Sequence, residues 1–204
     1  MILDTLQSLD RQITLTLNSL HFEASDYFWQ FFSLKETWYP LYAAILFIII
    51  KRQGWKQGLI MVTAMVLTIV ACDQVANLVK NSVCRLRPCY DSYMIRQGLH
   101  VLEGKSGYYG FFSGHAANAF GFAAASSICL EADKNHRYGA YQWFIFIWAA
   151  LIGLSRIFAG KHYFGDVVVG AIVGFCLGCI FAGLASRFVT RRERLSPSGS
   201  RGNL

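Results

Sequence analysis

Apolar residues are concentrated in about five long segments, which shorter polar stretches separate. A helix needs roughly 20 apolar residues to cross a bilayer. The segments lie at about residues 37–50, 57–79, 112–130, 140–159 and 165–186. Aromatic residues, which favour the membrane interface, stand at their ends: Trp38, Tyr39, Tyr108, Tyr109, Tyr141 and Trp143. The pattern predicts an all-α, polytopic membrane helix bundle of about five spans.

The N-terminal region differs from these spans. The segment at 37–50 is short, so we expect part of the aromatic stretch Tyr27–Phe32 to precede it as an interfacial or re-entrant lead-in. The first twenty residues have an apolar period of three to four, typical of an amphipathic helix, at Leu3, Leu6, Leu9, Ile13, Leu17 and Leu20. Because this helix also carries Asp4, Asp10 and Arg11, it either lies in the interface or packs against the bundle. No cleavable signal peptide is expected.

The chain shows no internal repeat and no linker to a second domain. We therefore expect one membrane domain over residues 1–186. Residues 187–204 are rich in Arg and then in Ser and Gly, and they predict a basic, disordered cytoplasmic tail.

Composition agrees with a membrane protein. Apolar residues make up 54% of the chain and charged residues 15%, against roughly 45–50% and about 25% in soluble domains. The net charge of +7 does not indicate nucleic-acid binding, because many of the basic residues flank apolar segments. The partners that we expect are the lipid bilayer and a lipid substrate, and no obligate protein partner is indicated.

The basic loops predict an orientation. Lys51, Arg52 and Lys56 separate the first two spans, further basic residues separate spans three and four, and an arginine run follows span five. With five spans, all three groups fall on one side, which the positive-inside rule makes cytoplasmic. The opposite side also carries cations, for which an anionic substrate is the obvious explanation: Lys80, Arg85, Arg87, Lys105, Arg156 and Lys161.

Phosphate-handling residues form three clusters on that opposite side. Phosphoryl transfer spreads negative charge over three oxygens, and Lys80, Arg87 and Arg156 can each stabilise part of it. Ser113 and Gly114 stand where the third span begins, and the free amide groups of a helix N-terminus bind anions. The clusters therefore predict a phosphate pocket.

Two histidines and a carboxylate complete the pocket. His162 and Asp166 are four residues apart, so Asp166 can hold one ring nitrogen while the other attacks phosphorus. His115 can protonate the departing alkoxide and then activate water. No metal or other cofactor is needed. The alternative, a metal site of His115, His162 and Asp166, is opposed by the three nearby cations.

The spacing of the clusters is specific. Lys80-(six residues)-Arg87-Pro88, Ser113-Gly114-His115 and Ser155-Arg156-(five residues)-His162-(three residues)-Asp166 resemble the three-part signature of the type 2 phosphatidic-acid phosphatase superfamily, which includes bacterial lipid phosphatases and vanadium haloperoxidases. The match covers about residues 80–166. One departure is Phe112, where the family usually has proline.

The resemblance implies a metal-independent reaction in two steps through a phosphohistidine. By position, His162 would be the nucleophile, Asp166 its partner and His115 the acid and base. The phosphate ligands would be Lys80, Arg87, Ser113, Gly114 and Arg156.

The sequence leaves the substrate open. We expect a lipid phosphatase of the inner (cytoplasmic) membrane with its site facing the periplasm, acting on lipid A or on undecaprenyl diphosphate. Phosphatidylglycerol phosphate and phosphatidic acid are less favoured. The alternative is an anion or lipid-phosphate transporter or binding protein that uses the same pocket without hydrolysis. It predicts polar groups in mid-span, whereas these groups gather at one end.

Some polar and sulfur-containing residues have no assigned role. Asp73 lies late in the second span and could pair with a cluster cation or face interfacial water. Of the six cysteines, Cys176 and Cys179 are expected to serve as packing residues. A disulfide between Cys84 and Cys89 is possible on an oxidising face, and the sequence does not decide it.

Overall fold

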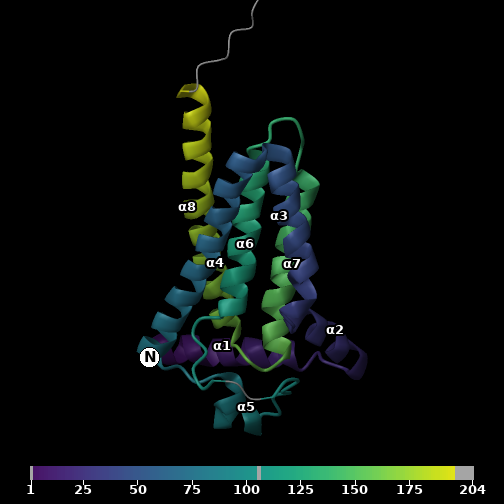
Figure 1. Ribbon diagram of the computed structural model, residues 1–204. Helices are drawn as coiled ribbons and strands as arrows, with labels where there is room; N and C mark the ends of the chain where they lie inside the picture. Colours follow the sequence, from purple (N-terminus) through teal and green to yellow (C-terminus); the bar gives the residue numbers. More distant parts are fainter. Residues whose placement is uncertain (1, 105–106, 196–204) are drawn as a thin grey trace, which may run out of the picture.

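The computed structural model describes residues 2–104 and 107–195. Five long helices stand side by side as a bundle (Figure 1), namely α3 (Tyr39–Gln53), α4 (Trp55–Val83), α6 (Gly114–Glu131), α7 (Gly139–Phe158) and α8 (Phe164–Leu195). Among the described residues there is no strand, only a single antiparallel bridge between Leu86 and Tyr109. The predicted all-α membrane bundle is confirmed.

Three helices, α4, α7 and α8, are each long and apolar enough to cross a membrane. The N-terminal lead-in is also found: α2 (Glu23–Ser33) meets the η1–α3 segment (Glu36–Gln53) at a bend of 67°, and together they qualify as a fourth, broken span. α6 is not among these candidates, since its 18 residues include His115, Asn118 and Glu131. It is the inner helix, packed against α4, α7 and α8.

Close packing of α6 on α8 fixes the second and third sequence clusters relative to each other. Gly170, Gly174 and Gly178 recur every four residues along α8, and each faces the backbone of α6. A Cβ atom at Gly178 would lie 2.5 Å from the carbonyl oxygen of Gly121. Because side chains at these positions would force the helices apart, glycine holds the start of α6 beside the start of α8.

The N-terminal helix α1 (Ile2–Asn18) crosses the lower end of the bundle in Figure 1. It packs against α7 and α8, as one of the two alternatives from the sequence predicts. The loop between α4 and α6 covers the same end and contains η2 (Pro88–Tyr90) and α5 (Ser92–Arg96). The basic turns between α3 and α4 and between α6 and α7 lie at the opposite end.

The predicted tail begins too early. α8 continues through Arg187 to Leu195, and the guanidinium of Arg192 lies 5.6 Å from the ring centroid of Phe188. Arginine favours helices and is stabilised near a helix C-terminus, so the apolar-to-basic change does not end the helix. The remaining residues of the predicted tail, 196–204, lie outside the described residues.

Candidate active site

The three sequence clusters meet at one end of the bundle. The first comes from the last turn of α4 and the loop after it, the second from the start of α6, and the third from the end of α7, the following loop and the start of α8. They bring together all eight residues that the sequence proposes: Lys80, Arg87, Ser113, Gly114, His115, Arg156, His162 and Asp166.

His162 is 2% exposed and lies in the tight loop between α7 and α8. Its Nδ1 faces Asp166 Oδ2 at 3.5 Å, and its Nε2 is 3.3 Å from Arg87 Nη1. A guanidinium can only donate, so the contact with Arg87 favours the tautomer with an unprotonated Nε2 and the proton on Nδ1. His162 therefore presents a lone pair toward the cations.

Burial lowers the pKa of His162 well below its ordinary value, and the positive charges of Arg87 and Arg156 lower this pKa further. Both effects favour the neutral imidazole, which is the form that can act as a nucleophile.

Asp166 is fully buried in the first turn of α8. Its Oδ1 accepts a hydrogen bond from Arg85 Nη1 at 2.7 Å, and its Oδ2 accepts one from the amide of Tyr163 at 3.0 Å. Its backbone carbonyl accepts from the amide of Ser113 at 2.9 Å. These bonds attach the carboxylate behind His162 to both the first and the second cluster.

Gly110 leaves room for this arrangement. A Cβ atom there would lie 3.0 Å from Cγ of Arg87, 3.4 Å from Oδ2 of Asp166 and 3.5 Å from Nδ1 of His162. The backbone of the α4–α6 loop therefore closes directly over the His162–Asp166 pair. Nothing in the sequence clusters indicates this role of Gly110.

Three of the predicted cations, Arg87, Arg156 and Lys80, lie around His162. The Nε atoms of Arg87 and Arg156 are buried, and they find no acceptor among the described residues. Lys80 Nζ approaches the start of α6, 3.5 Å from where a Cβ of Gly114 would stand. Since buried donors normally have acceptors, these groups indicate an anion site.

Arg156 also contacts two segments beside the site, the end of α2 and the α4–α6 loop. It donates to Ser33 at the end of α2 and lies 3.4 Å from a carboxylate oxygen of Glu103. Ser33 itself donates to Glu103, and Lys161 donates to the carbonyl of Gly104. Ser33 and Glu103, which sequence reasoning did not select, therefore bind α2 and the long loop to the third cluster.

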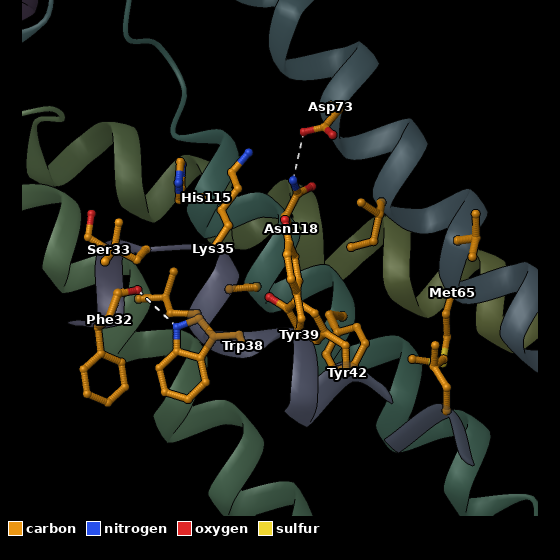
Figure 2. A pocket seen from close by; sticks show the side chains of 17 residues that line it. Phe32, Ser33, Lys35, Trp38, Tyr39, Tyr42, Met65, Asp73, His115 and Asn118 are labelled. Carbon is orange, nitrogen blue, oxygen red and sulfur yellow. Dashed lines mark hydrogen bonds between the residues drawn. The ribbon is translucent and has the colours of Figure 1, made fainter. Parts of the chain in front are cut away.

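An apolar cavity of about 320 Å³ adjoins the pocket (Figure 2). His115 and Lys35 lie at one end of it, and Asp73 of α4 accepts a hydrogen bond of 2.8 Å from Asn118 of α6. The rest of the lining is largely hydrophobic and includes Trp38, Tyr39, Tyr42, Met65, Val66 and Phe122. Asp73 is exposed and bonds to an amide rather than to a cluster cation, so of the two sequence alternatives the structure favours the one in which it faces interfacial water.

A second group of metal-ligand side chains lies apart from this site. His21, Asp26 and His100 bring their ligand atoms within 4.8 Å of one another. However, the two imidazole rings are stacked at 3.6 Å with an interplanar angle of 5°. Nitrogen lone pairs lie in the ring plane, so parallel rings do not direct them to a common ion. The cluster links the start of α2 to the α4–α6 loop through Asp26.

The cation and cysteine predictions are settled in part. Arg85 is explained by carboxylates rather than by a substrate, because it pairs with Asp10 and Asp166. Lys105 lies outside the described residues. Cys84 and Cys89 are both free thiols, so the structure contains no disulfide between them.

Comparisons with known proteins identify the family of the chain. The sequence profile of the PAP2 superfamily matches residues 55–190. A lipid A 4'-phosphatase of Bacteroides thetaiotaomicron is 36% identical over 206 residues, which cover 98% of this chain and 88% of that protein. A lipid A 4'-phosphatase of Porphyromonas gingivalis is 32% identical over 171 residues, which cover 83% of this chain and 70% of that protein.

Two solved structures share the fold. The crystal structure of Aquifex aeolicus LpxE matches with a TM-score of 0.62 and 22% identity, over 84% of this chain and 93% of that one. A PAP2-type phosphatidylglycerolphosphate phosphatase from Bacillus subtilis matches with a TM-score of 0.70 and 20% identity, over 90% and 87%. The chain belongs to the PAP2 superfamily and is a membrane lipid phosphatase, a phosphoric-ester hydrolase.

Proposed function

We propose that the protein removes the 4'-phosphate of lipid A through a phosphohistidine on His162. The observation that carries the reaction is the position of His162: a buried, neutral imidazole lies between Asp166 and Arg87, with unsatisfied arginine donors in front of it. The substrate is supported by the two relatives that are lipid A 4'-phosphatases.

In the first step, the Nε2 lone pair of His162 attacks phosphorus. The P–N bond forms as the bond between phosphorus and the lipid oxygen breaks, and His115 gives a proton to the departing alkoxide. Asp166 stabilises the positive charge that develops on the imidazole, because it faces Nδ1 at 3.5 Å. The cations stabilise the charge on the phosphoryl oxygens.

In the second step, His115 accepts a proton from water, and the resulting nucleophile attacks phosphorus. The P–N bond breaks and inorganic phosphate leaves. This division of labour is supported by the different surroundings of the two histidines, since His115 lines the apolar cavity and His162 does not. The lipid part of the substrate would occupy that cavity, next to the group that protonates its oxygen.

We place the site on the periplasmic face of the inner membrane. The basic turns and the phosphate pocket lie at opposite ends of the bundle, which supports this orientation through the positive-inside rule. In a Cys84→Ala background, which removes the exposed free thiol at the pocket end, a cysteine introduced into the α6–α7 turn at Asn135 would then be labelled by a membrane-impermeant maleimide only after the cells are opened.

The test of substrate is phosphate release by the purified protein in detergent with EDTA present. Lipid A carrying both phosphates is the main substrate, and mass spectrometry identifies the phosphate that leaves. Polyprenyl diphosphate, phosphatidylglycerol phosphate and phosphatidic acid are compared, and His162→Ala is the control. Loss of the 4'-phosphate alone supports the proposal, whereas faster turnover of any other lipid contradicts it.

A further inference from the structure

One face of α1 reaches the catalytic loop with polar side chains. Asp10, Thr14 and Asn18 are spaced by four residues, so they lie on the same face of the helix. Thr14 and Asn18 are at most 1% exposed, although α1 lies at the end of the bundle. Such burial of polar groups requires specific partners.

Those partners are backbone groups on either side of His162. Asn18 donates to the carbonyls of Ile157 and Phe158 at 3.0 and 3.2 Å. Thr14 accepts from the amide of Phe164 at 2.9 Å, and Asp10 accepts from the amide of Gly165 at 2.7 Å.

The last two contacts satisfy amides that a helix leaves free in its first turn. α1 therefore caps the N-terminus of α8, next to Asp166.

Arg85 connects α1 to the catalytic carboxylate. One of its terminal nitrogens, Nη2, donates to Asp10 Oδ2 at 2.6 Å, and the other, Nη1, donates to Asp166 Oδ1 at 2.7 Å. The guanidinium also lies 4.0 Å from the ring centroid of Tyr163, and the Arg85 carbonyl accepts from the amide of Gly110 at 2.9 Å. Arg85 is thus held on several sides and has one carboxylate on each terminal nitrogen.

We propose that Arg85 and Asp10 are positioning residues for the His162–Asp166 pair, and that α1 is part of the catalytic apparatus. Arg85 holds Asp166 by Oδ1, which leaves Oδ2 directed at His162 Nδ1. Asp10 accepts the hydrogen bond of the other terminal nitrogen, Nη2, and its negative charge offsets part of the positive charge of Arg85. Without Asp10, Arg85 would be free to turn its full charge toward Asp166 and draw the carboxylate away from the imidazole.

This inference rests on the proposed nucleophile but not on the identity of the lipid. Neither residue is placed to touch the phosphate, so we expect their loss to lower kcat and to leave KM within about twofold. The expected decrease in kcat is about 100-fold for Arg85→Gln and about 10-fold for Asp10→Asn. Arg85→Lys keeps one charged donor and should retain more activity than Arg85→Gln.

The decisive experiment is a double-mutant cycle on the full-length protein in detergent, with release of phosphate from lipid A as the readout. If Asp10 acts through Arg85, Asp10→Asn will cause no further loss in the Arg85→Gln background. If α1 only supports the fold, the two losses will multiply, and the proposal is wrong.

Arg11→Gln is the matched control. Arg11 also ties α1 to the α4–α6 loop, through Asp91 at 2.7 Å, but has no bond to Asp166 among the described contacts. We expect its kcat to stay within about twofold of wild type, and a loss as large as that of Asp10→Asn would also overturn the proposal.

Two further arms keep the test interpretable. If Asp10→Asn gives little folded protein, Arg85→Lys is compared with Arg85→Gln instead. Equal activity of these two variants would refute the positioning proposal. If the wild type does not act on lipid A, the substrate proposal has failed, and the same cycle is measured with phosphatidic acid in detergent micelles.

Discussion

The surroundings of His162 and of His115 are built in opposite ways. Behind His162 the protein is dense and charged, with Asp166 fully buried and bonded to Arg85 and to the Tyr163 amide. Beside His115 lies an apolar cavity lined by side chains of α2, α3, α4, α6 and α7. The charged wall can hold a nucleophile in one orientation, while the cavity can accept an acyl or sugar portion of a lipid. We infer that chemistry and lipid selection reside in different halves of the site.

The largest effect should follow from removing the nucleophile. His162→Ala is expected to lower kcat by ~10⁴-fold or more, because no other described side chain in the pocket stands between a carboxylate and the cations. Phosphate release from lipid A measures this, with His136→Ala as control, since His136 lies in the α6–α7 loop at the opposite end. Residual activity above one-hundredth of wild type would be incompatible with nucleophilic catalysis by His162.

His115→Ala should have a smaller effect, about 10²- to 10⁴-fold in kcat, because it removes proton transfer but keeps the nucleophile. The defect in the first step alone should shrink for a lipid phosphate with an acidic aryl leaving group, which departs without a proton. The burst of alcohol or phenol released before phosphate, measured with alkyl and aryl esters, tests this. An equal loss of burst rate on both esters would show that His115 does not protonate the leaving group.

Arg87→Gln tests the role of the positive charge next to His162. It should lower kcat/KM by about 10²- to 10³-fold and also change the pH dependence. The pKa of His162 is depressed by burial and by Arg87, so activity in the wild type should persist as pH falls below the ordinary histidine range of about 6.5. Removing the positive charge makes the imidazolium less costly, so the acid limb of kcat/KM should move to higher pH. A movement toward lower pH would show that Arg87 does not act on this group.

The smallest effect concerns the cavity. Val66 lines it, whereas Val70 stands one turn farther along α4 and is 50% exposed outside it. Val66→Trp should raise KM for lipid A about threefold to tenfold, equivalent to about 0.6–1.4 kcal/mol, with kcat little changed. Val70→Trp should leave both values near wild type. Equal KM values for the two variants would show that the cavity does not bind the lipid.

Much of this architecture can be read from the sequence because its signals are local. The apolar segments predict the helices, and the spacing of the three clusters predicts which residues meet. The positions of Arg85 and Asp10 could not be predicted in this way, since their contacts join residues 75 and 81 positions apart. From the sequence, Arg85 is one more cation of the outer side, and Asp10 is one of the charged residues of a helix that either lies in the interface or packs against the bundle.

The spacing of Asp10, Thr14 and Asn18 defines a polar stripe on α1, but the polar face of any amphipathic helix has such a stripe. The burial of Thr14 and Asn18 against the α7–α8 loop is seen only in the structure. The extent of α8 past Arg187 was missed for a different reason: a change from apolar to basic residues marks the end of a membrane span, but it does not end a helix.

The central claim is that phosphate passes through His162. Lipid A labelled with ³²P at the 4' position is mixed with enzyme in detergent, quenched in alkali within milliseconds, and the protein is mapped by mass spectrometry. The account predicts an alkali-stable, acid-labile phosphate on His162, absent in His162→Ala and prolonged in His115→Ala. Label on another residue, or release of phosphate with no labelled protein at any time, would contradict it.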